Sequence, residues 1–353
     1  MERAVAPGTQ IMKKKILHVL KMNQYSGAEN VAITICSRLK GKYEFAYTCP
    51  DGAIRWWLEK EGICFYPMAQ FTLGELKKVL HQYQPDIVHA HDFSASVYCG
   101  MLKRQRILIS HLHNNPRWIR TWGWRSLLYQ ISKQKFNHIL LVSGAIQKEA
   151  VFLQEADRRT IIKIGNPIDQ NKIRIGAEEF QAQSCDLLFV GRMTAQKNPS
   201  RFIRMISRLR AGGVNVQALM VGDGELLLDC KRQIRTLGMQ PFIRMMGFCK
   251  NPYPYIRQAK LLLVTSDWEG YGMVVAEALV LGIPVLATAV GGLNMVLRDY
   301  PPALCRSEME LYRKAYRLLT ERACYETYKR RLLESIQLPG IQAYMDAIKQ
   351  IYG

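Results

Sequence analysis

Short apolar segments alternate with amphipathic segments along this chain of 353 residues, and the alternation occurs twice. The apolar segments are rich in Ile, Leu and Val, which is typical of parallel strands that are buried on both faces. The first series comprises 16–20, 86–89, 107–110 and 139–142, and the second comprises 187–190, 217–221, 261–265 and 284–288. Strands that alternate with helices predict two doubly wound, mainly parallel sheets of an α/β fold.

Turn-forming residues at 165–169 and a polar stretch at 178–184 separate the two series. We therefore expect one domain to end and the next to begin between these stretches. A Pro-Gly break precedes a last helical pattern near the C-terminus. The predicted units are a disordered segment or extension at 1–12, an N-terminal domain at 13–175, a C-terminal domain at 176–338 and a final helix at 339–353.

Net charge, cysteine spacing and the length of apolar runs limit which classes of protein this chain can belong to. The formal net charge is +20, with most of the excess in residues 1–175. Such a basic face can bind a phosphorylated substrate, anionic lipid or nucleic acid. No RNA-binding or DNA-binding motif accompanies the charge, so we expect no nucleic-acid partner. The nine cysteines form no Cys-x-x-Cys pair and no apolar run is long enough to cross a bilayer, which together predict a cytoplasmic protein.

Two glutamates flank a glycine-rich turn that follows the apolar segment 261–265. The residues are, in order, Glu269, Gly270, Tyr271, Gly272, Met273, Val274 and, three positions later, Glu277. A helix that begins after the glycines points unpaired N–H groups and a partial positive charge at the loop, where a diphosphate can bind. Glu277 could then accept hydrogen bonds from ribose hydroxyls, and Glu269 from those of an attached sugar. The alternative is two carboxylates without a ligand, and the spacing alone does not separate the two.

A second loop, 191–197, follows the segment 187–190 and carries Arg192 and Lys197. Cleavage of a sugar from a nucleoside diphosphate leaves negative charge on the departing phosphate, and fixed cations stabilise that charge. We predict that Arg192 and Lys197 supply these cations. The alternative is a pair of surface cations in an already basic protein.

The chain resembles the retaining glycosyltransferases of the GT-B fold, specifically the family 4 group (glycosyl transferases group 1) of the polysaccharide-biosynthesis type. That group has a donor-site signature of Glu, seven residues and Glu, which matches Glu269 to Glu277 here. Further matches are the Ser26-Gly27-Ala28-Glu29 loop, Gly191-Arg192, Lys197 and Gly291-Gly292. The resemblance implies two Rossmann-like domains that face a cleft, the first binding the acceptor and the second the nucleotide-sugar. It also implies that the final helix returns to the N-terminal domain.

The loop after the first apolar segment contains Ser26 and Gly27, whose small size lets backbone N–H groups approach a phosphate or sugar. We predict that both contact the donor, although a tight turn of purely structural importance is the alternative. Relatives more often have two glycines here, and Ser26 replaces the first. Gly222 and Phe248 follow later strands at the expected cleft edge, near the nucleobase in relatives. We expect Phe248 to pack rather than to stack on a base, and the glycines 291–292 to shape the floor of the donor pocket.

Either of two histidines could match the histidine that faces the transferred sugar in relatives. His111 and His113 follow the segment 107–110, and alternation places both on one face. The register of the resembled motif favours His113. A similar pair, His89 and His91, either lines the acceptor side or has a structural hydrogen-bonding role. We expect no metal ligands among the four, because no carboxylate or thiol completes a site, and the resemblance implies no metal or other cofactor.

The segment 118–136 interleaves tryptophans with cations and continues as an amphipathic helix. Its aromatic and basic residues are Trp118, Trp122, Trp124, Arg117, Arg120, Arg125, Lys133 and Lys135. This composition favours peripheral contact with an anionic membrane, at the inner face of the plasma membrane. A helix that packs its apolar stripe on the sheet and exposes a basic face is an equally good interpretation.

The motifs and the resemblance together predict a retaining glycosyltransferase that moves a sugar from a nucleotide-sugar to a carbohydrate or lipid-linked acceptor in surface polysaccharide biosynthesis. A UDP-sugar is favoured over GDP-mannose. In this interpretation His113, Glu269, Arg192 and Lys197 are the catalytic residues. The alternatives are a GT-B protein that does not transfer sugar, such as a sugar-nucleotide epimerase or phosphorylase, and a polyanion-binding protein.

Overall fold

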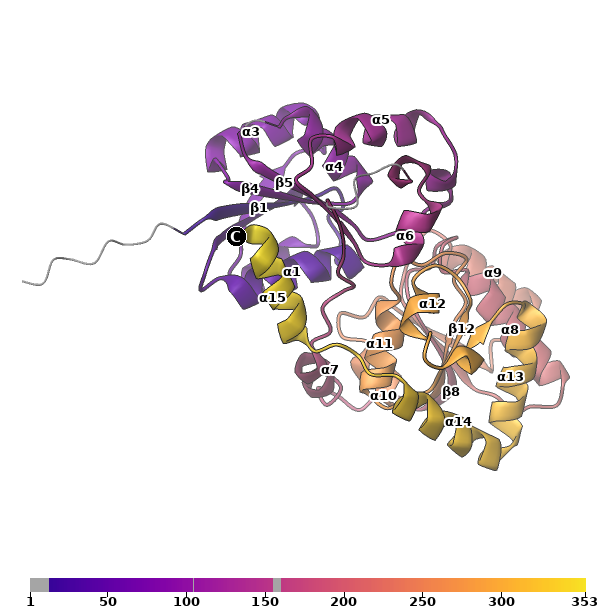
Figure 1. The fold of residues 1–353 in the computed structure, drawn as a ribbon. Helices are drawn as coiled ribbons and strands as arrows, with labels where there is room; N and C mark the ends of the chain where they lie inside the picture. Colours follow the sequence, from indigo (N-terminus) through magenta and orange to yellow (C-terminus); the bar gives the residue numbers. More distant parts are fainter. Residues whose placement is uncertain (1–12, 104, 155–159) are drawn as a thin grey trace, which may run out of the picture.

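The computed structural model describes residues 13–103, 105–154 and 160–353. The segment 1–12, expected to be an extension or disordered, lies outside the described residues. The chain forms two parallel sheets, each flanked by helices, which lie one above the other in Figure 1. This arrangement is the α/β, two-sheet GT-B architecture that the alternating pattern and the resemblance predicted.

The first sheet has seven parallel strands in the order β3-β2-β1-β4-β5-β6-β7. Its strands are β1 (Lys15–Leu20), β2 (Glu44–Pro50), β3 (Cys64–Met68), β4 (Ile87–His91), β5 (Ile107–Leu112), β6 (His138–Leu141) and β7 (Ile161–Lys163). Its helical segments are α1 (Gly27–Leu39), α2 (Arg55–Glu61), α3 (Leu73–Tyr83), α4 (Phe93–Met101), η1 (Arg117–Arg120), α5 (Trp124–Lys133), α6 (Gly144–Glu149) and η2 (Val151–Leu153). The central strands are buried on both faces, which explains their nearly continuous apolar sequences.

The second sheet has six parallel strands in the order β10-β9-β8-β11-β12-β13. Its strands are β8 (Cys185–Val190), β9 (Ala218–Val221), β10 (Ile243–Gly247), β11 (Ala259–Val264), β12 (Val285–Thr288) and β13 (Leu304–Cys305). The helical segments around it are α7 (Gln170–Gly176), α8 (Pro199–Ala211), α9 (Leu227–Thr236), α10 (Tyr253–Arg257), α11 (Met273–Val280), α12 (Leu293–Val296), η3 (Pro301–Ala303), α13 (Glu308–Thr320) and α14 (Arg322–Ser335).

The last helix, α15 (Ile341–Tyr352), leaves the second half of the molecule and packs on the first, beside α1 (Figure 1). Its buried side chains Ile348 and Tyr352 belong to a core cluster with Ile16 of β1 and Ile87 of β4. The Lys14 ammonium donates a hydrogen bond of 3.0 Å to the Tyr352 carbonyl oxygen. The C-terminus is thereby held against the first sheet.

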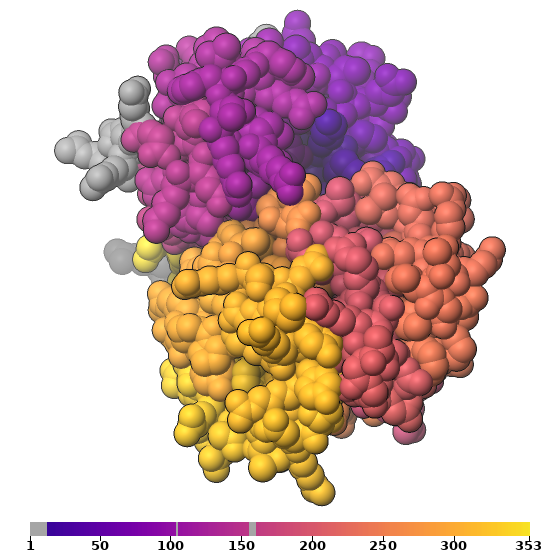
Figure 2. Space-filling model, turned by 90° about the vertical axis from the view of Figure 1, so that its right-hand side faces the viewer, coloured from indigo at the N-terminus to yellow at the C-terminus, as the bar shows by residue number. Residues whose placement is uncertain are grey.

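The two halves contact each other along the line where their coloured surfaces meet in Figure 2. In both sheets the order reverses beside the first strand, between β1 and β4 and between β8 and β11. Ligands of doubly wound sheets bind beyond the carboxyl ends of the strands at such a reversal. The loops that follow these central strands therefore bring the candidate residues together.

Candidate active site

The glutamate that follows β11 is held by a cation from the loop after β8. The Lys197 ammonium lies 2.6 Å from a carboxylate oxygen of Glu269, and the Ser266 hydroxyl donates to the same oxygen at 3.1 Å. Glu269 is 8% exposed, so little water competes for this carboxylate. The loops after the neighbouring strands β8 and β11 thus bring Lys197, the predicted cation for the phosphate, to Glu269, the predicted acceptor for sugar hydroxyls.

The glycines of this region allow main chains to approach one another. A Cβ atom on Gly270 would lie 1.9 Å from the His113 carbonyl oxygen, and one on Gly291 would lie 2.0 Å from that of Glu269. A Cβ atom on Gly222, whose φ is +141°, would lie 1.9 Å from the Gly191 carbonyl oxygen. No side chain fits at these distances. The glycines therefore bring the loop after β11 against the His113 backbone of the other half.

Helix α11 begins at Met273, directly after the left-handed Gly272. Its first internal hydrogen bond runs from the Val275 N–H to the Gly272 carbonyl at 3.0 Å, so the Met273 and Val274 N–H groups precede it. Glu277 lies one turn further on. Burial raises the pKa of the Glu277 carboxyl to about 7, and the nearby Lys197 opposes this shift. Glu277 is thus close enough to Lys197 to feel its charge, and it lies in the helix whose positive end begins at Met273.

Arg192 is exposed in the loop after β8. Its guanidinium donates a hydrogen bond of 3.5 Å to Gln196, which in turn lies 3.4 Å from the Asn114 amide nitrogen of the other half. The charge of Arg192 also lowers the pKa of Glu29, which lies in the first half. Arg192 therefore faces the space between the halves.

Sequence reasoning did not single out Glu29 as a site residue. It lies in the first turn of α1 and is 2% exposed. Burial raises the pKa of its carboxyl to about 7, although a hydrogen bond from Ser26 and the charge of Arg192 lower it. The spacing of Ser26 and Glu29 matches a capping box, but Ser26 caps no backbone group and instead donates its hydroxyl hydrogen to Glu29. Gly27 is exposed beside them.

Tyr271 and Phe248 have opposite environments. Tyr271 is 5% exposed, and its ring would lie 3.3 Å from a Cβ atom on Gly165, so the tyrosine packs against the turn that precedes α7. Phe248 is 59% exposed after β10. The expectation that Phe248 packs was therefore wrong, because more than half of its side chain is exposed. Its aromatic face is open for stacking on a base.

The histidines at the ends of β4 and β5 share one face of the sheet, as the alternation predicted. His89, His91 and His111 are fully buried, whereas His113 is half-buried at the edge of the sheet. His89 and His91 form hydrogen bonds to other rings, which favours the structural alternative for this pair. The backbone of His113 lies at the contact between the halves, since a Cβ atom on Gly270 would meet its carbonyl oxygen.

The expectation that nothing completes a metal site rested on four histidines, and the structure adds a fifth. His18 of β1 lies beside His89 and His91, and the ring nitrogens of these three residues lie within 4.8 Å of one another. The same holds for His91, His111 and His113. Neutral imidazoles can bind transition metals, so these rings could hold an ion. Their nitrogens are, however, paired with each other at hydrogen-bond distance.

A cation–π contact connects the halves near Phe248. The ammonium of Lys250, two residues after Phe248, lies 3.8 Å from the centre of the Trp56 ring of α2. The neighbouring Trp57 stacks on Tyr25 of the loop before α1, with ring centres 4.0 Å apart. Aromatic side chains of the first half thus face the loop of the second half where the base was predicted to bind.

Helix α5 exposes the apolar face that one of the two sequence interpretations expected to pack on the sheet. Its buried residues are Ser126, Tyr129 and Ser132. Its large apolar residues face outward: Trp124 is 68% exposed and Ile131 is 67% exposed. The interpretation in which the apolar stripe packs on the sheet is therefore wrong. The exposed apolar face has Arg125 beside it, whose guanidinium lies 5.1 Å from the Trp124 ring.

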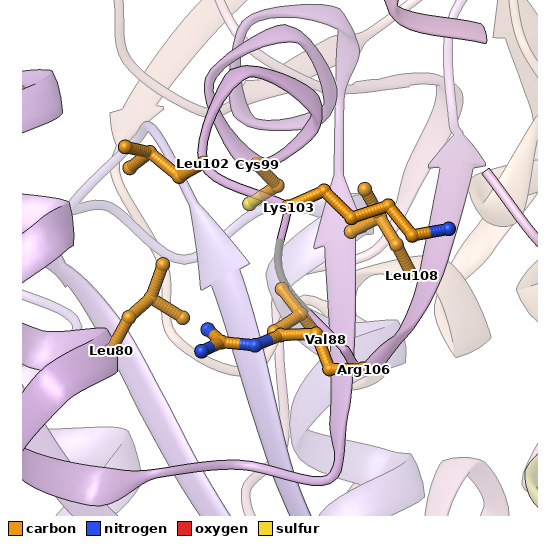
Figure 3. A pocket seen from close by; sticks show the side chains of 7 residues that line it. All are labelled: Leu80, Val88, Cys99, Leu102, Lys103, Arg106 and Leu108. Atoms are coloured by element: carbon orange, nitrogen blue, oxygen red, sulfur yellow. The ribbon is translucent and has the colours of Figure 1, made fainter. Parts of the chain in front are cut away.

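A small pocket between α3, α4, β4 and β5 lies away from this site (Figure 3). It is lined by Leu80, Val88, Leu108 and the Cys99 thiol, and burial raises the pKa of that thiol. Val88 alternates with His89 along β4, so the pocket opens on the opposite face of the sheet from the histidines. It contributes no residue to the candidate site.

No helix in the described part of the chain is both long and apolar enough to cross a bilayer.

Two family models match adjacent parts of the chain. Residues 25–172 match the model described as Glycosyltransferase Family 4, and residues 173–330 match Glycosyl transferases group 1. The boundary between the two matches lies in α7, between the two sheets. Every predicted site residue from Ser26 to Glu277 falls within one of the two matches.

Individual proteins that the chain resembles share about a quarter of their residues with it or fewer. The chain is 26% identical over 219 residues to the lipopolysaccharide 1,6-galactosyltransferase of Escherichia coli K12, covering 60% of this chain and 58% of that enzyme. It is also 26% identical over 292 residues to the O-antigen biosynthesis glycosyltransferase WbnH of Escherichia coli, covering 79% and 80%. A crystal structure of Anabaena HepE in complex with UDP-glucose superposes with a TM-score of 0.80 at 19% identity, covering 96% of this chain and 99% of that one.

Proposed function

Because the chain belongs to the glycosyl transferases group 1 and glycosyltransferase family 4, we propose that it transfers a sugar from a UDP-sugar to a hydroxyl group of a carbohydrate or lipid-linked acceptor, with retention of configuration, in the assembly of a surface polysaccharide. The observation that carries the proposal is the ion pair of Lys197 and Glu269 beside the N-terminus of α11. This arrangement offers positive charge for a diphosphate and a carboxylate for sugar hydroxyls within one small space.

In the proposed reaction the acceptor hydroxyl attacks the anomeric carbon on the face that the phosphate leaves. The bond from that carbon to the phosphate oxygen breaks, and the departing phosphate accepts the proton of the acceptor. Lys197, Arg192 and the N-terminus of α11 stabilise the negative charge that develops on this phosphate. Glu269 accepts hydrogen bonds from the sugar and Glu277 from the ribose. His113 contacts the sugar at the edge of the first sheet.

The relatives support the choice of donor, and the charges of the site support a proposal without a metal. HepE, whose fold is similar, was crystallised with UDP-glucose, and the related enzyme of Escherichia coli is a galactosyltransferase. The exposed ring of Phe248 suits a base of any identity, so it does not discriminate against uracil. Two side-chain cations and a helix terminus offer positive charge to the diphosphate, which is the charge that a divalent ion would otherwise supply.

The test is a binding and transfer experiment on the purified full chain in EDTA. We expect UDP and UDP-sugars to raise the melting temperature and GDP-mannose to raise it less, because a ligand that binds only the folded state stabilises it. NMR of the product should show the anomeric configuration of the donor. Inversion of configuration would exclude the proposed mechanism. Conversion of the UDP-sugar without an acceptor would indicate an epimerase, and stabilisation by polyanions alone would indicate a polymer-binding protein.

We also propose that the apolar face of α5 contacts an anionic membrane and so brings a lipid-linked acceptor to the cleft. Trp124, Leu127 and Ile131 are each at least half exposed on this face, and Arg125 lies among them. Aromatic and aliphatic groups beside cations are suited to the headgroup region of a bilayer, where they bury apolar surface and meet anionic lipid.

Sedimentation with vesicles of phosphatidylglycerol and phosphatidylcholine tests this contact. The double variant Trp124→Ser/Ile131→Ser should bind several-fold more weakly than the wild type. Leu228→Ser is the matched control, since Leu228 is 70% exposed on α9 in the other half and its loss should leave binding unchanged. Equal loss in both variants, or no loss in either, would reject α5 as the contact.

A further inference from the structure

Two consecutive residues after β5 contact different loops of the second half. A Cβ atom on Gly270, in the loop after β11, would lie 1.9 Å from the His113 carbonyl oxygen. The side-chain amide of Asn114 meets the side-chain amide of Gln196, in the loop after β8. The first contact is made by main chains and the second by side chains. A substitution can therefore remove the second contact and leave the main chain as it is.

The amides of Asn114 and Gln196 pair with each other in both directions. Nε2 of Gln196 donates to Oδ1 of Asn114 at 3.3 Å, and Nδ2 of Asn114 donates to Oε1 of Gln196 at 3.4 Å. Gln196 is 8% exposed and Asn114 is half-buried, so little water competes for these hydrogen bonds. The pair thus joins the first half to the second through two hydrogen bonds.

Neighbouring groups of fixed polarity set the orientation of both amides. The Asn115 N–H donates to Oδ1 of Asn114 at 2.9 Å. Nε2 of Gln196 donates to the Trp268 carbonyl oxygen at 3.2 Å, and the Arg192 guanidinium donates to Oε1 of Gln196 at 3.5 Å. An N–H or a guanidinium only donates and a carbonyl only accepts, so each amide has one orientation. The two orientations are complementary to each other.

The amide of Gln196 uses all of its hydrogen-bonding capacity within the protein. Its two N–H groups reach Asn114 and the Trp268 carbonyl, and its oxygen accepts from Asn114 and Arg192. A primary amide has two donor hydrogens and two acceptor lone pairs, and all four are taken. Gln196 therefore has none left for a substrate and can act only through its neighbours.

Gln196 also holds together the two loops that carry the ion pair. It directly precedes Lys197, and Trp268 directly precedes Glu269. Besides the side-chain hydrogen bond to the Trp268 carbonyl, the main-chain carbonyl of Gln196 accepts a hydrogen bond of 2.8 Å from the Asp267 N–H. The main chain and the side chain of one residue thus hold the loop after β8 against the loop after β11.

We propose that Gln196 is a positioning residue: its paired amide fixes Arg192 and Lys197 relative to the end of β5 and so aligns the donor sugar with the acceptor hydroxyl. This inference rests on the proposed function, in which these cations bind the diphosphate and His113 contacts the sugar. The reacting groups are then held by different halves of the molecule. A misplacement of about 1 Å between such groups can cost on the order of 100-fold in rate.

The first measurement is the steady-state kinetics of Gln196→Met and Asn114→Leu with a UDP-sugar as donor. Both substitutions nearly keep the volume of the side chain and remove its hydrogen bonds. Each should lower kcat about 10- to 30-fold, since two hydrogen bonds between the halves are lost. KM for the donor should change less than about twofold in Asn114→Leu, because the cations for the diphosphate lie in the other half.

Asn137→Ala is the matched control for Asn114→Leu. Oδ1 of Asn137 accepts a hydrogen bond of 2.9 Å from the Leu108 N–H, at the opposite end of β5. This variant should have a lower melting temperature and an unchanged kcat. An equal loss of kcat in Asn137→Ala and Asn114→Leu would show that lost stability, and not lost alignment, explains the effect, and would overturn the proposal.

The double variant Gln196→Met/Asn114→Leu separates a pair from two independent residues. If the amides act through each other, kcat of the double variant should be about as low as that of the more affected single variant. Losses of kcat that multiply would overturn the proposal, and so would a wild-type kcat in either single variant. A higher KM for the donor with unchanged kcat in Gln196→Met would assign this residue to donor binding instead.

Melting temperatures of the same proteins without ligand report the contact apart from turnover. The decrease in the double variant should be smaller than the sum of the two single decreases, and equal sums would show that the amides do not pair in solution. If the wild type transfers no sugar, the proposed function fails and this inference fails with it, although the melting temperatures still record the contact. If the wild type transfers sugar and kcat does not respond, only the positioning role fails. Asn114→Leu decides the kinetic test if Gln196→Met does not fold.

Discussion

The two sheets have the same arrangement around their first strands but carry opposite chemistry at the carboxyl ends of those strands. In the second half the loops after β8 and β11 carry an ion pair, Lys197 with Glu269. In the first half the ends of β1, β4 and β5 carry histidines that burial keeps neutral, His113 among them. The same sheet topology thus carries charged side chains in the second half and neutral histidines in the first half, on the two sides of the contact between the halves.

Under the proposed function, this difference matches the two parts of a nucleotide-sugar. A diphosphate needs positive charge, and charge that is preorganised near the leaving oxygen lowers the barrier. A sugar ring has only hydroxyl groups, which neutral acceptors and donors can recognise without the cost of burying ions. In that proposal, the ions of one half serve the phosphate and the neutral rings of the other half serve the sugar.

The largest effect should come from removing the cation of the second half. Lys197→Ala should lower kcat about 100- to 1,000-fold, because it removes charge stabilisation of the departing phosphate and leaves Glu269 unpaired. Lys231→Ala is the control, since Lys231 is an exposed cation on α9 of the same half. Steady-state kinetics measures both. Less than a tenfold loss in Lys197→Ala would remove this lysine from the proposed mechanism.

Removing the neutral ring of the first half should have a smaller effect. His113→Ala should lower kcat about tenfold, the effect expected for one lost hydrogen bond near the sugar. The loss should be equal at pH 6 and pH 8, because burial lowers the pKa of His113 to about 3 and the ring stays neutral at both values. His81→Ala, on the exposed face of α3, is the control. A loss confined to pH 6 would show that the protonated ring acts instead.

Glu29 should make stability depend on pH. Its pKa is about 7 in the folded protein against an ordinary value of 4.5, so the folded state binds the proton more tightly than the unfolded state. Its favourable contribution is therefore complete below about pH 4.5 and is lost as the pH rises to about 7. Glu29→Gln keeps an acceptor for the Ser26 hydroxyl. It should raise the free energy of unfolding at pH 8 by up to about 3 kcal/mol and change it little at pH 4.5.

Denaturant unfolding at the two pH values measures this prediction. Glu75→Gln is the control, because a hydrogen bond from Lys78 lowers the pKa of that half-buried carboxyl on α3, so the sign of its effect is reversed. A Glu29→Gln protein that is less stable than the wild type at pH 8 would show that the carboxylate is stabilised by its partners.

The smallest effect should come from the contact between the halves. Trp56→Ala removes the ring over which Lys250 lies and should raise KM for the donor about two- to threefold, in keeping with a cation–π energy of about 0.5–1 kcal/mol. A double-mutant cycle with Lys250→Ala isolates the pair. If the two effects add, the contact does not couple the halves.

The alternating pattern predicted the two sheets because strands buried on both faces need apolar sequences. It found β1, β4, β5 and β6 of the first sheet and β8, β9, β11 and β12 of the second, and it missed β2, β3, β7, β10 and β13. The residues of β3 are mostly exposed or half-buried, which hides the apolar pattern, but β2 is buried and was missed all the same. The Glu269 to Glu277 spacing and the loop that carries Lys197 named residues that lie close together in the structure, since the carboxyl ends of parallel strands meet at one edge. The direct ion pair of Lys197 with Glu269 at 2.6 Å was not predicted and is known only from the structure.

The sequence by itself determined the α/β architecture, the family and the residues of the loop after β11, because these depend on local patterns and short motifs. The tertiary structure alone decided what depends on distant segments meeting. Examples are Tyr352 reaching His89, Gly270 touching the His113 backbone and the outward apolar face of α5. Side-chain periodicity defines the faces of a helix or strand but does not say which face another element will cover.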